Sequence, residues 1–143
     1  MPTISLCMIA KNEERYLEQC LNSVKDLVDE IIIVDTGSID KTKEIAKKFG
    51  AKIFDFKWID DFSAARNESL KHATKDWILV LDADEIIEKD NLEKIRNLIE
   101  KEKEFFGFQF CQRSYINNYF EDAQKNDSDF KLVKKYPLYI SHF

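Results

Sequence analysis

The sequence contains little glycine, proline or cysteine: three, two and three residues among 143. With so few glycines, the segment after the first apolar run has no glycine-rich loop of the kind that cradles phosphates. The cysteines Cys7, Cys20 and Cys111 lie far apart and form no CxxC pair, which argues against a cysteine-based metal or redox motif. We expect them to be buried free thiols.

Long apolar runs and an excess of positive charge are also absent. No stretch approaches the roughly 18 to 20 apolar residues of a membrane span, and the first residues do not form a signal-peptide pattern. The net charge is −5 and no basic stripe stands out, which argues against a nucleic-acid partner. We therefore expect a cytoplasmic protein without a transmembrane segment, with peripheral attachment at the inner face of the membrane left open.

The residues that are present indicate a single globular domain with alternating elements. Apolar residues make up 44% of the chain and charged residues 34%. We expect strands at residues 4–9, 30–34, 51–56 and 77–81, and helices at 14–25, 41–49, about 60–73 and 91–104. Ser38 and Asp40 can cap the second of these helices, Gly50 is expected just beyond its end, and residues 60–63 open the third by the same capping chemistry. Residues 106–111 alternate like a half-buried strand, and an aromatic-rich tail follows from 115 to 143. The alternation predicts an α/β fold with a mostly parallel sheet and helices on both faces.

Acidic residues follow two of these strands. Asp35 ends the second apolar run, and Asp82 and Asp84 follow the fourth. Ligands of parallel sheets bind at the carboxyl ends of the strands. If the chain is still extended there, Asp82 and Asp84 project to one side, and two carboxylates in one small volume favour a divalent cation such as Mg²⁺. The alternative is a solvated acidic loop that caps the next helix.

Adjacent strand ends would bring Ala10, Glu13, Asp35 and Asp82 around one crevice. The Asp35 carboxylate could accept a hydrogen bond from a pyrimidine N–H, and Glu13 from ribose hydroxyls. Each has a plainer alternative: Asp35 as the acceptor of an Asx turn, and Glu13 as a favourable negative charge in the first turn of a helix.

Arg66 is expected early in a helix, where the helix dipole disfavours a positive charge. An arginine placed there could stack on a base or pair with a phosphate, or it could form a surface ion pair with Glu68 or an aspartate. His72 and His142 have no partner pattern, and we predict no ligand role for either.

Four segments, residues 4–13, 33–42, 62–67 and 77–85, resemble the nucleotide-sugar half of a family 2 glycosyltransferase. Each segment is weak evidence alone, but the four occur in the right order and spacing from about residue 3 to 90. The resemblance implies a GT-A fold, which is a Rossmann-like three-layer sandwich. It also implies a nucleoside diphosphate sugar donor, expected to be UDP-linked, and Mg²⁺ or Mn²⁺ as the cofactor.

The resemblance also assigns roles by position. Ala10 and Glu13 would touch the nucleoside, Asp35 the base, Arg66 the base or diphosphate, Asp82 the ribose and metal, and Asp84 the metal as its direct ligand. The reaction implied is inverting sugar transfer to a glycan, lipid or protein acceptor. Cell-envelope polysaccharide synthesis is a process in which such a transfer would be expected.

The resemblance leaves the general base and the acceptor half open. Glu121, Asp122, Asp127 and Asp129 are available acids, but none lies in a pattern that can be matched. Family members are commonly much longer, so we expect residues 1–110 to form the donor part and 111–143 an incomplete start of the acceptor part. A truncated, binding-only domain is one alternative. A sugar nucleotidyltransferase is another, although it should carry a glycine-rich and basic phosphate loop.

Overall fold

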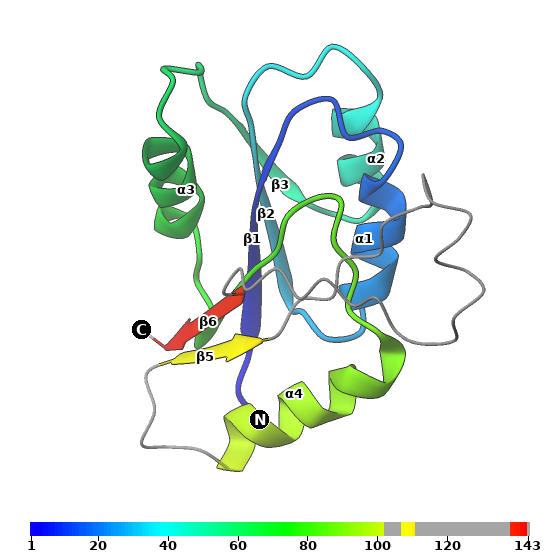
Figure 1. Ribbon diagram of the computed structural model, residues 1–143, viewed down its shortest axis with the longest axis vertical. Coiled ribbons are helices and arrows are strands. Elements are labelled where there is room, and N and C mark those ends of the chain that lie inside the picture. The colour runs from blue at the N-terminus through cyan, green and yellow to red at the C-terminus, as the bar shows by residue number, and fades with distance from the viewer. Residues whose placement is uncertain (102–106, 111–137, 143) are drawn as a thin grey trace, which may run out of the picture.

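The computed structural model describes residues 1–101, 107–110 and 138–142. Its centre is a six-stranded sheet in the order β3-β2-β1-β4-β6-β5 (Figure 1). The strands are β1 (Ile4–Ala10), β2 (Glu30–Asp35), β3 (Lys52–Asp55), β4 (Trp77–Val80), β5 (Gly107–Phe110) and β6 (Leu138–His142). The first four are parallel, whereas β6 runs antiparallel to both β4 and β5. The predicted α/β class with a mostly parallel sheet is confirmed.

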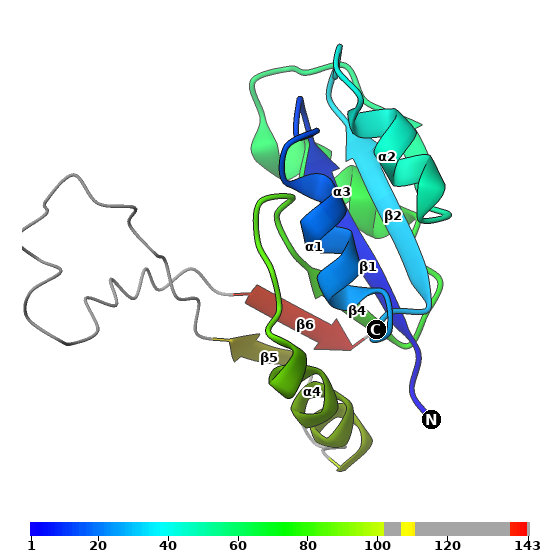
Figure 2. The ribbon, with the colours of Figure 1, turned by 90° about the vertical axis from the view of Figure 1, so that its right-hand side faces the viewer.

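Helices cover both faces of this sheet. They are α1 (Leu17–Val24), α2 (Thr42–Lys48), α3 (Phe62–Lys71) and α4 (Lys89–Lys101). Figure 1 shows the sheet between α3 on one side and α1 and α2 on the other, with α4 beside β5 and β6. Figure 2 faces the side that α1 and α2 cover. The arrangement has three layers.

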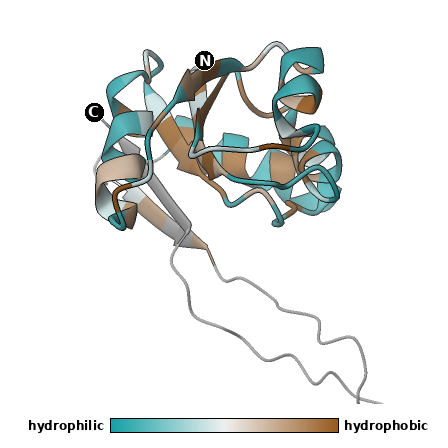
Figure 3. Ribbon diagram, turned by 90° about the horizontal axis from the view of Figure 1, so that it is seen from above, coloured by the Kyte–Doolittle hydropathy of each residue, from teal (hydrophilic) through white to brown (hydrophobic). Residues whose placement is uncertain are grey.

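The core lies on both faces of the strands, so β1 and β2 read as nearly continuous apolar runs. In Figure 3 the strands at the centre of the fold are mostly brown, the colour of hydrophobic residues. On the face covered by α1, the fully buried Leu6 and Met8 belong to the same cluster as Leu17 and Leu21. Cys7, Ile32 and Ile78 form a second cluster with Phe54 and Leu70. Burying each such aliphatic side chain contributes roughly 1.5 to 3 kcal/mol before the entropy cost of folding.

Two predicted helix signals are confirmed. Gly50 follows α2 with φ +71°, the left-handed conformation expected of a residue just beyond a helix. At the start of α3, the Asp61 side chain accepts a hydrogen bond from the Ala64 N–H at 3.0 Å. This N-cap satisfies one of the amides that the first turn of a helix leaves open.

The first helix and the turn before α2 differ from expectation. Helix α1 begins at Leu17 rather than 14, because residues 14–16 form turns in front of it. Before α2, the N-cap residue is Lys41, which makes no side-chain cap, and Asp40 lies one residue earlier, where it accepts from the Thr42 N–H at 2.9 Å. Ser38 does not cap the helix; its hydroxyl accepts from the Asn12 N–H at 2.9 Å and so joins two loops.

The sequence pattern did not predict β6. Residues 138–142 lie in the tail, yet they insert between β4 and β5 in the same sheet. The boundary expected near residue 110 stays a prediction. Cys111, Glu121, Asp122, Asp127 and Asp129 lie outside the described residues, as does the side chain of His142.

A buried carboxylate joins the strands at the end of the sheet opposite the acidic loops. Glu30 is 8% exposed and accepts hydrogen bonds from Ser5 Oγ at 2.5 Å, Lys52 Nζ at 2.7 Å, and the N–H and hydroxyl of Thr74 at 3.0 Å. Burial alone would raise the pKa of Glu30, but these hydrogen bonds outweigh it and hold the pKa at about 2. The charged form therefore stabilises the fold.

Within the described residues, no helix is both long enough and apolar enough to cross a membrane.

Candidate functional site

The carboxyl ends of the parallel strands β1, β2 and β4 all lie toward the same edge of the sheet, and the loops after β1 and β2 form the top of Figure 1. Strand β1 lies between β2 and β4, and its last residue, Ala10, is the register partner of Asp35 at the end of β2. Asp82 follows β4 on the other side of β1. The structure therefore brings Ala10, Asp35 and Asp82 to one edge, where the sequence analysis expected adjacent strand ends to present them.

Asp35 is a buried carboxylate with one oxygen engaged and one open. Its side chain is 1% exposed, and Oδ1 accepts from the N–H groups of Gly37 at 3.0 Å and Ser38 at 2.8 Å. This is the Asx turn that the sequence analysis offered as the plainer role, and Gly37 at φ +108° permits it. Oδ2 is buried and has no hydrogen-bond partner among the described residues. Because a buried acceptor without a partner costs free energy, Oδ2 is suited to accept from a ligand N–H.

Lys43 is a neighbour of Asp35 that the sequence analysis missed. Its Nζ lies 3.8 Å from Asp35 Oδ1 and pairs with Asp55, the register partner of Asp35 on β3. Its position in the first turn of α2, eight residues after Asp35, could have indicated a cation near the carboxylate.

Hydrogen bonds between the β1–α1 and β2–α2 loops fix the position of Glu13. Asn12 has φ 54°, a left-handed conformation that asparagine tolerates, and its Oδ1 accepts from the Ile39 N–H at 2.9 Å. The next residue, Glu13, donates its N–H to Thr42 Oγ1 at 2.7 Å. Glu13 precedes α1 rather than lying in its first turn, so the plainer role of a helix charge does not apply as stated. Asn12 is a second residue that the sequence analysis missed.

The segment from Asp82 to Glu85 forms a turn. Strand β4 ends at Val80, so the premise of an extended chain at Asp82 and Asp84 is wrong. The Glu85 N–H donates to the Asp82 carbonyl at 3.0 Å, and the Asp82 N–H donates to Glu85 Oε2 at 2.8 Å. Ala83 is buried at 3%, whereas Asp82 and Asp84 are exposed. The turn therefore still presents both carboxylates to solvent, and Glu85 closes it.

Negative charge concentrates around this turn. Burial raises the pKa of Glu13, and the charges of Asp84, Asp40 and Asp82 raise it further. The pKa of Glu85 is also raised, first by burial and then by Asp82 and Asp84, although the Asp82 N–H opposes the shift. These carboxylates disfavour one another's ionisation, and a bound cation would reduce the repulsion between them.

Arg66 projects from α3 into the same corner. Its Nη2 donates to Asp82 Oδ1 at 2.9 Å, while Nη1 is buried and finds no partner in the described part of the chain. The ion pair with an aspartate therefore exists, but the aspartate belongs to the candidate site. Glu68 instead pairs with Lys71 and His72.

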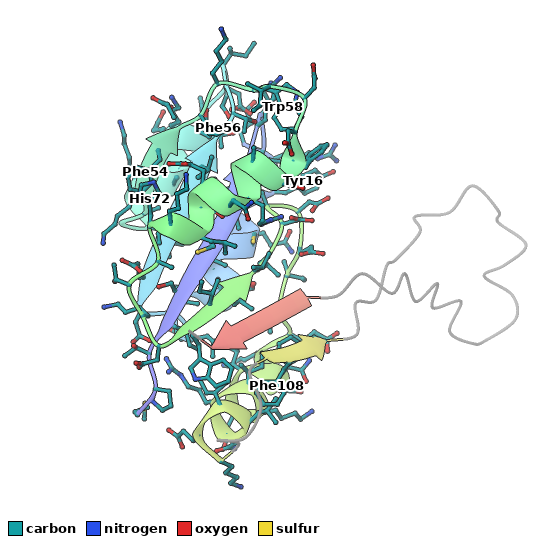
Figure 4. The ribbon with its side chains drawn as sticks, turned by 90° about the vertical axis from the view of Figure 1, so that its left-hand side faces the viewer. Tyr16, Phe54, Phe56, Trp58, His72 and Phe108 are labelled. Carbon is teal, nitrogen blue, oxygen red and sulfur yellow. The ribbon has the colours of Figure 1, made fainter. Side chains whose placement is uncertain are left out.

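His72 has a structural environment away from this corner. Its ring stacks on Phe54 with centroids 3.5 Å apart, and Figure 4 shows the two side by side near α3. Its Nε2 lies 3.0 Å from Glu68. Nothing in this arrangement points to a ligand.

The carboxylates fit a divalent cation only if the ligand completes its coordination. In residues 1–101, 107–110 and 138–142, no three His, Cys, Asp or Glu side chains are grouped to hold a metal ion. Asp82 and Asp84 can supply one or two oxygen ligands. That is the usual protein share for Mg²⁺, whose other positions are filled by phosphate oxygens and water, and Mn²⁺ accepts the same oxygen ligands. The donor set therefore fits Mg²⁺ or Mn²⁺ together with a phosphorylated ligand.

Two of the three cysteines are buried free thiols, as expected. Cys20 lies below the acidic turn with its Sγ 3.5 Å from the Asp82 carbonyl oxygen, and Cys7 Sγ lies 3.5 Å from the Ser69 carbonyl oxygen. Burial, together with nearby carboxylates, raises the pKa of each thiol to about 12. Such thiols are poor nucleophiles and poor metal ligands.

Sequence comparison gives a family and several relatives. The model of "Glycosyl transferase family 2" matches residues 5–142. A TPR repeat-containing protein of Synechococcus elongatus is 59% identical over 85 residues, which is 59% of this chain and 21% of that protein. The SPbeta prophage-derived glycosyltransferase SunS of Bacillus subtilis is 41% identical over 120 residues, 82% of this chain and 28% of its own length. The chain thus spans about a fifth to a third of these relatives.

Solved structures show the same fold. S. aureus TarS (residues 1–349) superposes with a TM-score of 0.62 at 26% identity over 69% of this chain and 32% of its own. Glucosyl-3-phosphoglycerate synthase of Mycobacterium tuberculosis, in complex with Mn²⁺ and UDP-glucose, gives a TM-score of 0.62 at 24% identity over 74% of this chain and 42% of its own. The three-layer sandwich is the GT-A fold implied by the resemblance. With a family match over nearly its whole length, the chain belongs to glycosyl transferase family 2.

Proposed function

We propose that this chain binds a UDP-linked sugar with Mg²⁺ or Mn²⁺ and takes part in inverting transfer of that sugar to an acceptor. The observation that carries the proposal is Asp35, whose Oδ2 is buried at the ligand edge of the sheet without a partner in the described residues. A uracil ring offers an N–H to such an acceptor. Family membership supports the reaction class.

The other residues at the edge divide the remaining tasks. Ala10 ends β1 beside Asp35 and would lie under the nucleoside, and the Glu13 carboxylate would accept from ribose hydroxyls. Arg66 has a buried nitrogen, Nη1, that would donate to the diphosphate. M. tuberculosis glucosyl-3-phosphoglycerate synthase is solved in complex with Mn²⁺ and UDP-glucose, but at 24% identity it supports the fold alone. The choice of a UDP-linked donor therefore rests on the buried Oδ2 of Asp35.

Asp82 and Asp84 would hold the metal from the turn after β4, with Asp84 as the direct ligand and Asp82 facing both ribose and metal. When bound, the metal neutralises charge that develops on the departing diphosphate. The chain's own contribution is to fix the turn, because the mutual hydrogen bonds of Asp82 and Glu85 hold both carboxylates toward solvent. Arg66 adds a positive charge that does not depend on the metal.

Inversion requires the acceptor hydroxyl to attack the anomeric carbon from the face opposite the diphosphate while a base removes its proton. We assign no base. The four acids named in the sequence analysis, Glu121, Asp122, Asp127 and Asp129, lie outside the described residues. The acceptor, whether glycan, lipid or protein, is equally unassigned.

A nucleotide screen tests the donor site. Thermal unfolding is measured with UDP, GDP, CDP and dTDP, each with and without Mn²⁺, and UDP with Mn²⁺ should raise the midpoint most. Asp84→Ala should lose the part of the shift that depends on the metal while its own midpoint without ligand stays near that of the wild type. If no nucleotide gives a metal-dependent shift, the donor-site proposal is wrong.

A binding-only domain is the second candidate, because the 120 residues matched to SunS are only 28% of that glycosyltransferase. Titration calorimetry with UDP-sugars, followed by an assay for sugar release or transfer, separates the two. Binding without turnover would support the binding-only form, whereas turnover would exclude it.

A further inference from the structure

The ion pair between Arg66 and Asp82 occupies one of the two candidate metal ligands in the nucleotide-free protein. Arg66 Nη2 lies 2.9 Å from Asp82 Oδ1, with the two side chains 28% and 59% exposed. A metal ion that is to use Asp82 must therefore displace a guanidinium or share the carboxylate with it. Asp84 has no ion pair among the described contacts.

We propose that Arg66 is a positioning residue that withholds Asp82 from the metal until a diphosphate binds, so that metal and nucleoside diphosphate are bound cooperatively. The inference rests on the proposed function, since it takes Asp82 as a metal ligand. It goes beyond that function by assigning the origin of the coupling to one ion pair.

The open nitrogen of Arg66 makes the exchange favourable. Nη1 is buried with no hydrogen-bond partner in the described chain, so the guanidinium uses only part of its donor fork on Asp82. A diphosphate carries more negative charge than one carboxylate and can accept from both terminal nitrogens at once. Moving Arg66 to the diphosphate would satisfy Nη1 and release Oδ1 of Asp82.

The size of the effect follows from the exposure of the pair. A partly exposed ion pair of this kind changes an equilibrium by about two- to fivefold. Removing it should tighten metal binding in the absence of nucleotide by that factor. By linkage, the factor by which the diphosphate strengthens metal binding equals the factor by which the metal strengthens diphosphate binding. Both factors should fall together when Arg66 is replaced.

The experiment measures Mn²⁺ binding to the full chain without nucleotide. Binding is followed by titration calorimetry or by the loss of the electron paramagnetic resonance signal of free Mn²⁺. Arg66→Gln should bind Mn²⁺ about two- to fivefold tighter than the wild type. Lys43→Gln is the matched control, because it removes one positive charge from the same sheet edge and frees a different carboxylate, Asp55. It should change Mn²⁺ affinity less than Arg66→Gln does.

A double-mutant cycle with Asp82→Asn isolates the pair. In the Asp82→Asn background, Arg66→Gln should no longer tighten Mn²⁺ binding, since the carboxylate that it frees is gone. Titration with UDP should then show a smaller gain in Mn²⁺ affinity for Arg66→Gln than for the wild type. Circular dichroism checks that each variant is folded, and Arg66→Lys serves as a second variant with a point charge in place of the fork.

The inference is overturned if nucleotide-free Arg66→Gln binds Mn²⁺ no tighter than Lys43→Gln, or if its effect persists in the Asp82→Asn background. Failure of the proposed function looks different. In that case UDP does not bind the wild type with or without Mn²⁺, which the nucleotide screen reports separately from the metal titration.

Discussion

Replacing Asp35 by asparagine would turn the open acceptor of the site into a donor. In Asp35→Asn the amide oxygen can keep the hydrogen bonds from Gly37 and Ser38, which places Nδ2 where Oδ2 lies in the wild type. A uracil N–H would then face another N–H. Hydrogen bonds to a charged group contribute roughly 1.5 to 3 kcal/mol, so UDP affinity should fall by about 10- to 150-fold. CDP affinity should fall less, because the cytosine ring nitrogen N3 accepts a hydrogen bond.

Titration calorimetry with UDP and CDP in the presence of Mn²⁺ measures both affinities. Asp55→Asn is the control, since it makes the same change on a 76% exposed register partner of Asp35. The unfolding free energy of Asp35→Asn should stay within about 1 kcal/mol of the wild type, because the altered oxygen has no hydrogen bond to lose within the described chain. A UDP loss below threefold, or an equal loss for CDP, would refute the placement of the base against Asp35.

Two further predictions concern the stability of the fold. Glu30→Gln should remove the contribution of Glu30 to acid sensitivity. In the wild type, the ionised Glu30 stabilises the fold fully above pH 4.5, and about 3 kcal/mol of this stability is lost as the pH falls through about 2. Urea unfolding at several pH values should therefore show a flatter dependence of the unfolding free energy on pH for the variant. An identical profile would contradict the hydrogen-bond network. Asp61→Ala removes the cap of the Ala64 N–H at the start of α3 and should cost about 1 kcal/mol; the same urea midpoint in both proteins would rule out that cap.

The positions of Asp35 and Asp82 at one edge were predictable from local pattern. Each follows an apolar run, and in a parallel sheet every strand ends on the same edge. The cap at Asp61 and the left-handed Gly50 were also predictable, because they depend on a few neighbouring residues. The extended chain at Asp84 was predicted wrongly, since the turn closed by Glu85 was not recognised.

The strand β6 and the loop contacts of Asn12 could not be read from the sequence. Strand β6 pairs with β4, more than 50 residues earlier in the chain, and nothing in residues 138–142 specifies that they insert between β4 and β5. Asn12 in the β1–α1 loop forms hydrogen bonds with Ser38 and Ile39 in the β2–α2 loop, which is distant in the sequence but adjacent in space. Such contacts depend on how the elements pack, not on the period of the pattern.

The sequence by itself determined the fold class, the family resemblance and the set of polar residues delivered to one edge, because strand and helix periodicity and strand ends are local properties. Only the tertiary structure decided the state of each of those residues. It shows Asp35 buried with one oxygen engaged by an Asx turn, and Arg66 already paired with Asp82 across 16 residues of chain. Burial and ion pairing depend on which elements pack together, so the tertiary packing determines the electrostatics of this site.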